Sequence, residues 1–311
     1  MQRPPTTLRN PFVLQNGGLI STGKRVTIER KNLHKINLYL QLTCPFDSIT
    51  EIITHSYRFL SDFREAVDNW KSLQEAPNPL GYASTIQAYA CGTPTALVYS
   101  YRAHLCANYY SVTSSSFIPN KYFCNCKDAI AAALRKLMDT YNGPVSHEVC
   151  NNCSKKDRFL VMRNTCVFDV DDSIVTTQYE TQEQTYHELL SSQQMFDCLK
   201  CFTRSLERRF VLGPYICFDT SYAHRHGHKS KLSAVPRELI LVGKKYILSG
   251  IVQYTPHDKH FIALCLSPTT GSWKVKNDLA KRSYDLHDDP QISIAMIFYV
   301  RVSTFQPVSG C

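Results

Sequence analysis

The spacing of apolar residues in the first half of the chain predicts helices. After Pro45, apolar side chains recur at three- and four-residue steps, which is the repeat of one face of an α-helix. This long pattern consists of Ile49, Ile52, Ile53, Leu60, Phe63, Val67 and Trp70. A second pattern covers about residues 128–141, and Gly143-Pro144 ends it.

The second half contains short runs rich in β-branched and aromatic residues, bounded by turn residues, and these runs predict strands. The predicted strands are 159–162, 166–170, 210–220, 238–242, 245–254, 260–266, 272–276 and 292–302, with a short helix over 183–191. Two earlier strands are expected over 25–28 and 38–43. Helices therefore precede antiparallel strands without strand–helix–strand alternation, which indicates the α+β class.

Composition places this pattern in a globular protein. The chain has 311 residues, 43% of them hydrophobic, which suits about two domains or one domain with an insertion. No apolar run approaches the ~18–20 residues of a membrane helix, and the polar N-terminus does not resemble a signal peptide. We therefore expect an intracellular protein, cytoplasmic or nuclear, without a membrane partner. The net charge is +9, but its basic residues are scattered and give little support for a nucleic-acid partner.

The 13 cysteines need a different explanation, because stable disulfides are rare in a reducing compartment. Four of them form two CxxC pairs, Cys150/Cys153 and Cys198/Cys201. Each pair places two thiolates on one tight turn, and two such turns complete a tetrahedral zinc site. His147 could replace one ligand. Four protein ligands leave no open coordination position, so the predicted zinc is structural; the alternative is four buried cysteines without a metal.

Cys44 directly precedes the first predicted helix, and Pro45 occupies its first turn. The partial positive charge of a helix N-terminus favours thiolate over thiol. Cys44 is therefore a candidate nucleophile, although a buried and inert cysteine remains the alternative for a single residue.

Two later segments supply possible partners for this thiol. If residues 267–270 close a hairpin between the strands on either side, His260 lies opposite Asn277 on one face of the sheet. An amide or carboxylate beside a histidine fixes the imidazole tautomer for a cysteine nucleophile. Asp278 is the second choice because strand alternation places it on the opposite face. A purely structural histidine is the alternative.

Taken together, these segments resemble the ubiquitin-specific proteases, which are papain-like isopeptidases. Thr43-Cys44-Pro-Phe-Asp-Ser48 is similar to the Cys box of that family, which usually reads T-C-x-x-N-S. The two CxxC pairs agree with its zinc-binding fingers in order and spacing. The resemblance extends from about residue 38 to 302 and includes the segments 213–219, 246–254, 260–262, 273–278 and 295–299.

The resemblance implies an α+β, papain-like cysteine protease fold with a thumb, zinc-binding fingers and a β-sheet palm. It implies an N-terminal arm over 1–36 and a single catalytic domain over 37–306. Within that domain, the thumb covers about 37–146, the fingers about 147–212 and the palm about 213–306.

The activity implied by the resemblance is thiol-dependent hydrolysis of an isopeptide bond after the C-terminal glycine of a modifier. Cys44 would attack, His260 would accept and return the proton, and Asn277 would orient His260. The implied partners are ubiquitin or SUMO and their protein conjugates, and the implied cofactor is structural zinc. The alternatives are a catalytically impaired modifier-binding protein and a zinc-dependent nucleic-acid-binding module.

The chain departs from the family pattern at the oxyanion site. The family usually carries an asparagine five residues before the nucleophile, where this chain has Tyr39. Gln41 or backbone N–H groups would have to replace that donor. Asp47 replaces the usual asparagine after the cysteine, and Lys259 replaces the glycine before the histidine. Several of these departures resemble the divergent SUMO-directed isopeptidase branch.

Overall fold

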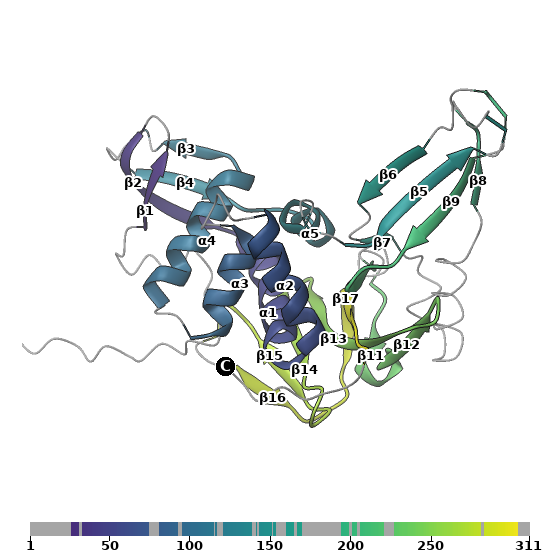
Figure 1. The fold of residues 1–311 in the computed structure, drawn as a ribbon. Coiled ribbons are helices and arrows are strands. Elements are labelled where there is room, and N and C mark those ends of the chain that lie inside the picture. The colour runs from purple at the N-terminus through teal and green to yellow at the C-terminus, as the bar shows by residue number, and fades with distance from the viewer. Residues whose placement is uncertain are drawn as a thin grey trace, which may run out of the picture.

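The structure is a computed structural model that combines helices with a large antiparallel sheet (Figure 1). It describes residues 26–30, 33–74, 81–92, 95–114, 116, 121–138, 141, 143–150, 152–153, 160–164, 167–169, 194–198, 201–203, 206–220, 227–280 and 283–303. The α-helices of these residues are α1 (Cys44–Phe59), α2 (Ser61–Gln74), α3 (Tyr82–Ala90), α4 (Thr95–Tyr109) and α5 (Ile130–Met138).

The long helical pattern after Pro45 forms two helices rather than one. Leu60 has an extended backbone (φ −121°, ψ 110°) and separates α1 from α2. The apolar spacing continues across this break because both helices pack against the same core. The second predicted helix, 128–141, is shorter and forms α5, while α3 and α4 were not predicted.

A small sheet in the order β1-β2-β4-β3 leads into the first helix. Its strands are β1 (Val26–Arg30), β2 (Leu33–Gln41), β3 (Val112–Ser114) and β4 (Lys121–Asn125). Strand β2 pairs antiparallel with β1 and parallel with β4. The predicted boundary of the N-terminal arm, at residue 36, therefore falls inside β2, and residues 1–25 lie outside the described part of the chain.

A nine-stranded sheet, here called the central sheet, forms the body of the C-terminal half. Its main path is β16-β15-β14-β13-β17-β10-β7, with β11 and β12 attached to β17 and β13. Its pairs are antiparallel except β7 with β10. The bounds are β7 (Phe168–Asp169), β10 (Tyr215–Asp219), β11 (Ser230–Lys231), β12 (Glu238–Leu241), β13 (Lys244–Thr255), β14 (His260–Leu266), β15 (Trp273–Lys276), β16 (Tyr284–Leu286) and β17 (Gln291–Arg301).

A separate four-stranded sheet, here called the finger sheet, projects from the body at the upper right of Figure 1. Its order is β6-β5-β9-β8, from β5 (Val145–Cys150), β6 (Leu160–Asn164), β8 (Gln194–Phe196) and β9 (Leu206–Val211). The single strand predicted over 210–220 is wrong, because Gly213-Pro214 divides it between β9 and β10 in two different sheets. The predicted helix over 183–191 lies outside the described residues.

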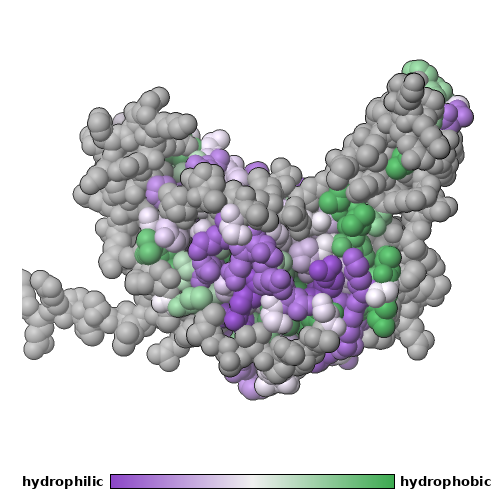
Figure 2. All heavy atoms as spheres, in the orientation of Figure 1, coloured by the Kyte–Doolittle hydropathy of each residue, from purple (hydrophilic) through white to green (hydrophobic). Residues whose placement is uncertain are grey.

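Apolar side chains fill both faces of the central sheet. One cluster lies between the sheet and the helices and includes Phe46, Ile53, Phe63 and Phe298. A second cluster covers the opposite face. Hydrophilic side chains spread over the outer surface of the helical layer at the centre of Figure 2. No helix in the described part of the chain is long and apolar enough to span a membrane.

Candidate active site and metal centre

Cys44 is the first residue of α1, and its side chain is buried, with 7% of the residue exposed. Pro45 follows in the first turn, where its missing N–H removes no helical hydrogen bond. Thr43 is the N-cap residue, but its side-chain oxygen accepts no hydrogen bond from the N–H groups of the helix. Its Oγ1 instead accepts a hydrogen bond of 2.7 Å from Arg102. The thiol therefore lies at the positive end of a helix, and Arg102, from outside that helix, binds the residue that precedes it.

Arg102 of α4 holds that first turn through a buried ion pair with Asp47. The Arg102 Nε donates to Asp47 Oδ1 at 2.7 Å, and a second nitrogen contacts Asp47 Oδ2. Burial lowers the pKa of Arg102, but the Asp47 carboxylate outweighs that effect and raises it above its usual range. Asp47, the residue that departs from the family pattern, thus has a charged partner that fixes it beside Cys44.

His260 begins β14 and is also buried, at 4% exposed. Its Nε2 lies 3.0 Å from Oδ1 of Asn277, in hydrogen-bond geometry. The same Asn277 oxygen accepts the backbone N–H of Leu279 at 2.9 Å. The structure therefore brings together the histidine and amide that the sequence paired.

The strand register behind this contact differs from the predicted one. His260 and Asn277 are not opposite one another, because β14 and β15 pair Ala263 with Lys276 and Leu266 with Trp273. The loop is longer than predicted, since the Ser267 N–H bonds to the Ser272 carbonyl at 2.9 Å. Asn277 lies beyond the end of β15, where the chain turns back toward the histidine.

Asp278 lies much closer to the histidine than strand alternation predicted. Its Oδ1 is 2.9 Å from His260 Nε2. The single N–H of that nitrogen points at Asn277, and among the described residues neither Asp278 oxygen has a hydrogen-bond partner. Asp278 therefore acts on His260 mainly through its buried negative charge.

The surroundings of His260 favour its protonated form. Burial lowers the pKa of His260, but the nearby Asp278 carboxylate, followed by Cys44, outweighs burial and raises the pKa from 6.5 to about 10. A cationic imidazole beside Cys44 stabilises a thiolate there. The arrangement therefore places a cationic imidazole next to the Cys44 side chain.

No contact among the described residues directs the side chain of Tyr39 or Gln41 toward the oxyanion site. Tyr39 is half-buried, and its ring lies 5.7 Å from that of Phe123. Gln41 is exposed at the end of β2. Between them and the nucleophile, Leu42 has a left-handed backbone (φ 55°), a strained conformation for this residue. The first N–H groups of α1 lack partners within the helix and are the donors nearest to the thiol in sequence.

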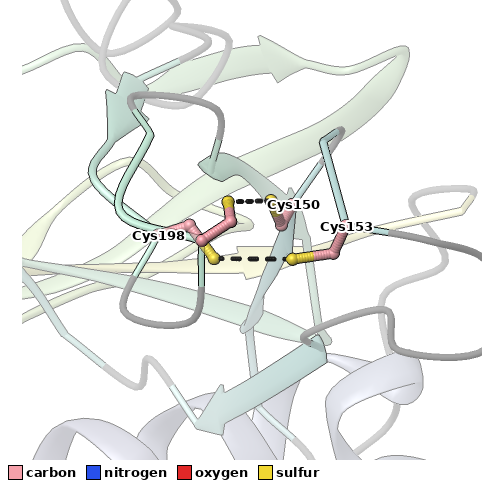
Figure 3. Close-up of side chains that lie close together, drawn as sticks. Cys150, Cys153 and Cys198 are labelled. Atoms are coloured by element: carbon pink, nitrogen blue, oxygen red, sulfur yellow. Dashed lines mark hydrogen bonds between the residues drawn. The ribbon is translucent and has the colours of Figure 1, made fainter.

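Four thiols converge at the end of the finger sheet, and Figure 3 labels three of their cysteines, Cys150, Cys153 and Cys198. The sulfur atoms of Cys150, Cys153, Cys198 and Cys201 all lie within 4.8 Å of one another. Cys150 and Cys201 are 3.5 Å apart, and Cys153 and Cys198 are 3.8 Å apart. A tetrahedral site with metal–sulfur bonds of about 2.3 Å has sulfur–sulfur edges of about 3.8 Å. The cluster therefore has the size and donor set that a metal ion requires.

The local backbone and the thiol chemistry agree with this cluster. The Cys198 N–H donates to the Thr203 carbonyl and the Phe202 N–H donates to the Cys198 carbonyl, both at 2.8 Å, forming a tight turn. Contacts with Cys150, then burial, raise the pKa of Cys153 to about 12, so a cation is needed for four thiolates to coexist. His147 lies in β5, and its side chain is outside the described residues.

Sequence reasoning missed several charged residues that surround the site. Arg102, Glu51 and Lys276 are buried and paired, whereas charged residues in a sequence are ordinarily taken as solvent-facing. One signal was available: an aspartate in the first turn of a buried helix, at position 47, requires a cationic partner.

Comparisons with known proteins give distant relatives. No protein-family model matches the chain. The 120.7 kDa protein in the NOF-FB transposable element of Drosophila melanogaster is 24% identical over 295 residues, covering 89% of this chain and 26% of that protein. The chain thus spans about a quarter of the length of this curated relative.

Among solved structures, the chain is similar to the SAGA Ubp8/Sgf11/Sus1/Sgf73 DUB module bound to ubiquitin aldehyde. The identity is 12%, the match covers 97% of this chain and 72% of that chain, and the TM-score is 0.46. The module bound to monoubiquitin gives a TM-score of 0.48 at 12% identity, with the same coverage. The yeast SAGA DUB module with an altered Sgf73 gives 0.42 at 12% identity, covering 97% of this chain and 71% of that chain. Because these TM-scores are all below 0.5, a function can be proposed only from the residues of this chain itself.

Proposed function

We propose that the chain is a cysteine-type isopeptidase that removes ubiquitin or a ubiquitin-like modifier from conjugated proteins. The observation that carries the proposal is the meeting of Cys44, His260 and Asn277 from α1, β14 and the loop after β15. His260 contacts Asn277 at 3.0 Å and is held protonated beside the thiol. Thiolate, imidazolium and an orienting amide are the groups that acyl transfer through cysteine requires.

The proposed reaction has two steps. The Cys44 thiolate attacks the carbonyl carbon of the terminal glycine of the modifier. The C–N bond then breaks as the His260 imidazolium protonates the leaving lysine amine, leaving a thioester on Cys44. Neutral His260 next accepts a proton from water, whose oxygen attacks the thioester and releases the modifier as a carboxylate. Asn277 and the charge of Asp278 orient the imidazole and stabilise its cation throughout.

The four finger cysteines are proposed to hold zinc in a structural role. Cys150, Cys153, Cys198 and Cys201 supply four thiolates, which suits Zn²⁺ and leaves no position for water or substrate. In this role the finger sheet provides a rigid surface for the folded body of the modifier, while its thin C-terminal tail enters the site beside Cys44.

The proposal is tested with ubiquitin and SUMO probes that carry a C-terminal electrophile. We expect covalent capture of one or both probes, lost in Cys44→Ala and retained in Cys91→Ala, which removes an exposed cysteine outside the site. The probe that is captured faster names the modifier. Absence of capture with both probes in a folded, metal-loaded protein contradicts the proposal.

A second candidate is a protein that binds a modifier but cleaves it slowly or not at all. It is favoured by the oxyanion site, because Tyr39 packs against Phe123 and Gln41 is exposed. Loss of one oxyanion donor can cost ~10²–10³ in rate. Reversible binding of ubiquitin or SUMO, without capture of the activated probe, distinguishes this candidate from the isopeptidase.

A further inference from the structure

Helix α1 and strand β14 run side by side, in the same direction and with contacts at both ends. At the first end, Cys44 lies within hydrogen-bond reach of His260. At the second, His55 Nε2 lies 2.9 Å from the Leu266 carbonyl oxygen. Eleven helical residues rise about 17 Å, and six strand residues rise about 20 Å. The two elements therefore keep nearly matched spacing along their shared length.

A buried ion pair lies between these two ends. Lys276 Nζ donates to Glu51 Oε2 at 2.7 Å, and the side chains are 3% and 2% exposed. Glu51 is seven residues after Cys44, two helical turns and about 10 Å along the same face of α1. Lys276 pairs across the sheet with Ala263, three residues or about 10 Å beyond His260. Glu51 and Lys276 thus lie at similar distances along the two elements from Cys44 and His260. Their contact therefore requires the same alignment of α1 with β14 that brings Cys44 to His260.

The pair also reaches the other two elements of the site. Lys276 is the last residue of β15 and directly precedes Asn277. The second oxygen of Glu51 accepts the hydroxyl of Tyr89, on α3, at 2.6 Å. One buried carboxylate therefore connects the nucleophile helix to α3 and to the strand that delivers the amide partner of His260.

Apolar contacts alone would not fix this register, since burial of apolar surface is not directional. Beneath α1, the backbone of Gly250 lies so close to the helix that a Cβ there would be 2.9 Å from Ile52. Close packing of this kind sets the distance between helix and sheet, but non-directional contacts permit movement along the helix axis. A buried charge pair does not, because separation leaves two charges without partners in an apolar interior.

We propose that Glu51 and Lys276 are positioning residues, which set the axial register of α1 against β14 and β15 and thereby the distance between Cys44 and His260. This inference rests on the proposed function, because the register matters only if those two side chains react together. Neither residue touches the reacting atoms.

The test measures the reactivity of Cys44 without any modifier. Iodoacetamide alkylation of Cys44, followed by peptide mass spectrometry at about pH 6, reports the thiolate because an ordinary thiol of pKa about 8.5 is then protonated. The variants are Lys276→Met and the double variant Glu51→Gln/Lys276→Met, which removes both charges together. Lys276→Arg keeps the charge, and Lys274→Met removes an exposed lysine from the same strand.

Lys276→Met is expected to slow Cys44 alkylation about tenfold or more and to lower kcat for a modifier substrate by ~10²-fold with little change in KM. The double variant is expected to fold and to show the same slow alkylation, whereas Lys276→Arg and Lys274→Met stay near wild type. If Lys276→Met does not fold, the alkylation rate of the double variant tests the inference.

Wild-type alkylation in a folded double variant would show that the pair only stabilises the protein, and the inference would be wrong. If the wild-type protein cleaves neither ubiquitin nor SUMO conjugates, the proposed function fails separately. The alkylation rates still decide whether the pair positions Cys44.

Discussion

The contact between α1 and the central sheet is built differently from the finger sheet. The first is part of a large apolar cluster and buries polar pairs such as Glu51–Lys276 and Ser56–Ser249. In the finger sheet, the cluster of buried residues in the described part of the chain consists of cysteines. Side-chain packing therefore sets the geometry of the candidate active site, whereas the proposed metal ligation would stabilise the finger sheet.

The largest expected effect separates reactivity from folding. Cys44→Ala removes the proposed nucleophile, and hydrolysis of a ubiquitin or SUMO conjugate should fall by ~10⁴ or more. The unfolding midpoint in urea should change little, because the substitution removes only one sulfur atom. Activity that persists in Cys44→Ala would place the nucleophile elsewhere in the chain.

Metal removal should affect the finger sheet and spare the body. Structural zinc sites contribute about 10–16 kcal/mol of apparent binding free energy, so chelation or Cys198→Ser should unfold β5 and β9. Hydrogen exchange should accelerate in those strands and stay slow in β14. Elemental analysis should find one zinc per chain. A metal-free protein with protected finger strands contradicts this picture.

The pKa of His260 and the pH dependence of the unfolding free energy should reveal the role of Asp278. The folded-state pKa of His260, about 10, lies above its ordinary value of 6.5. Protonated His260 therefore stabilises the fold below about pH 6.5, and this contribution is lost as pH rises through about 10. Asp278→Asn should lower the pKa of His260 by about 1–3 units, measured by NMR titration. The matched variant Asp285→Asn, at an exposed carboxylate, should leave the pKa unchanged.

Two glycine substitutions compare the regions directly. A Cβ at Gly250 would lie 2.8 Å from the Leu264 carbonyl oxygen and 2.9 Å from Ile52, so Gly250→Ala should push α1 from the sheet. We expect a loss of about 1–3 kcal/mol in unfolding free energy, with slower alkylation of the nucleophile. Gly213→Ala, at the base of the finger sheet, should leave alkylation unchanged. Equal effects of both variants on alkylation would contradict the separation of the two regions.

The smallest effect is expected away from both regions. Val242 and Gly243 join β12 to β13 with positive φ angles of 50° and 69°, a turn that favours Asn-Gly. Val242 is 58% exposed. Val242→Asn should therefore raise the unfolding free energy by about 1 kcal/mol, measured by urea denaturation, without any change in alkylation or hydrolysis. A loss of stability would show that this backbone conformation needs the valine.

The local elements of the fold were largely predictable from the sequence. Strand β14 begins and ends at the predicted residues 260 and 266, because alternation and flanking turn residues are local signals. The break at Leu60 was not predictable, since no glycine or proline marks it. Helix α4 carries apolar residues around its circumference rather than on one face, so periodicity did not identify it.

The contact between His260 and Asn277 was found despite an incorrect register. The observed pairing of β14 with β15 is shifted by two residues from the predicted one, and an even shift keeps every side chain on its predicted face. The proximity of Asp278 could not be predicted, because it depends on how the chain turns after β15. The thiol cluster followed from spacing alone, since each CxxC pair is a local motif.

The two ends of the finger segment meet at a single point. A Cβ on Gly213 would lie 2.6 Å from the backbone carbon of Gly143, so the chain enters and leaves the finger sheet at nearly the same place. The entropy cost of bringing the ends of a segment together grows only slowly with the length of the segment. The segment between these ends is not confined to the finger sheet, because its strand β7 pairs with β10 in the central sheet. Substitutions in β5, β6, β8 and β9 can therefore change the finger sheet alone, whereas substitutions in β7 change the edge of the central sheet.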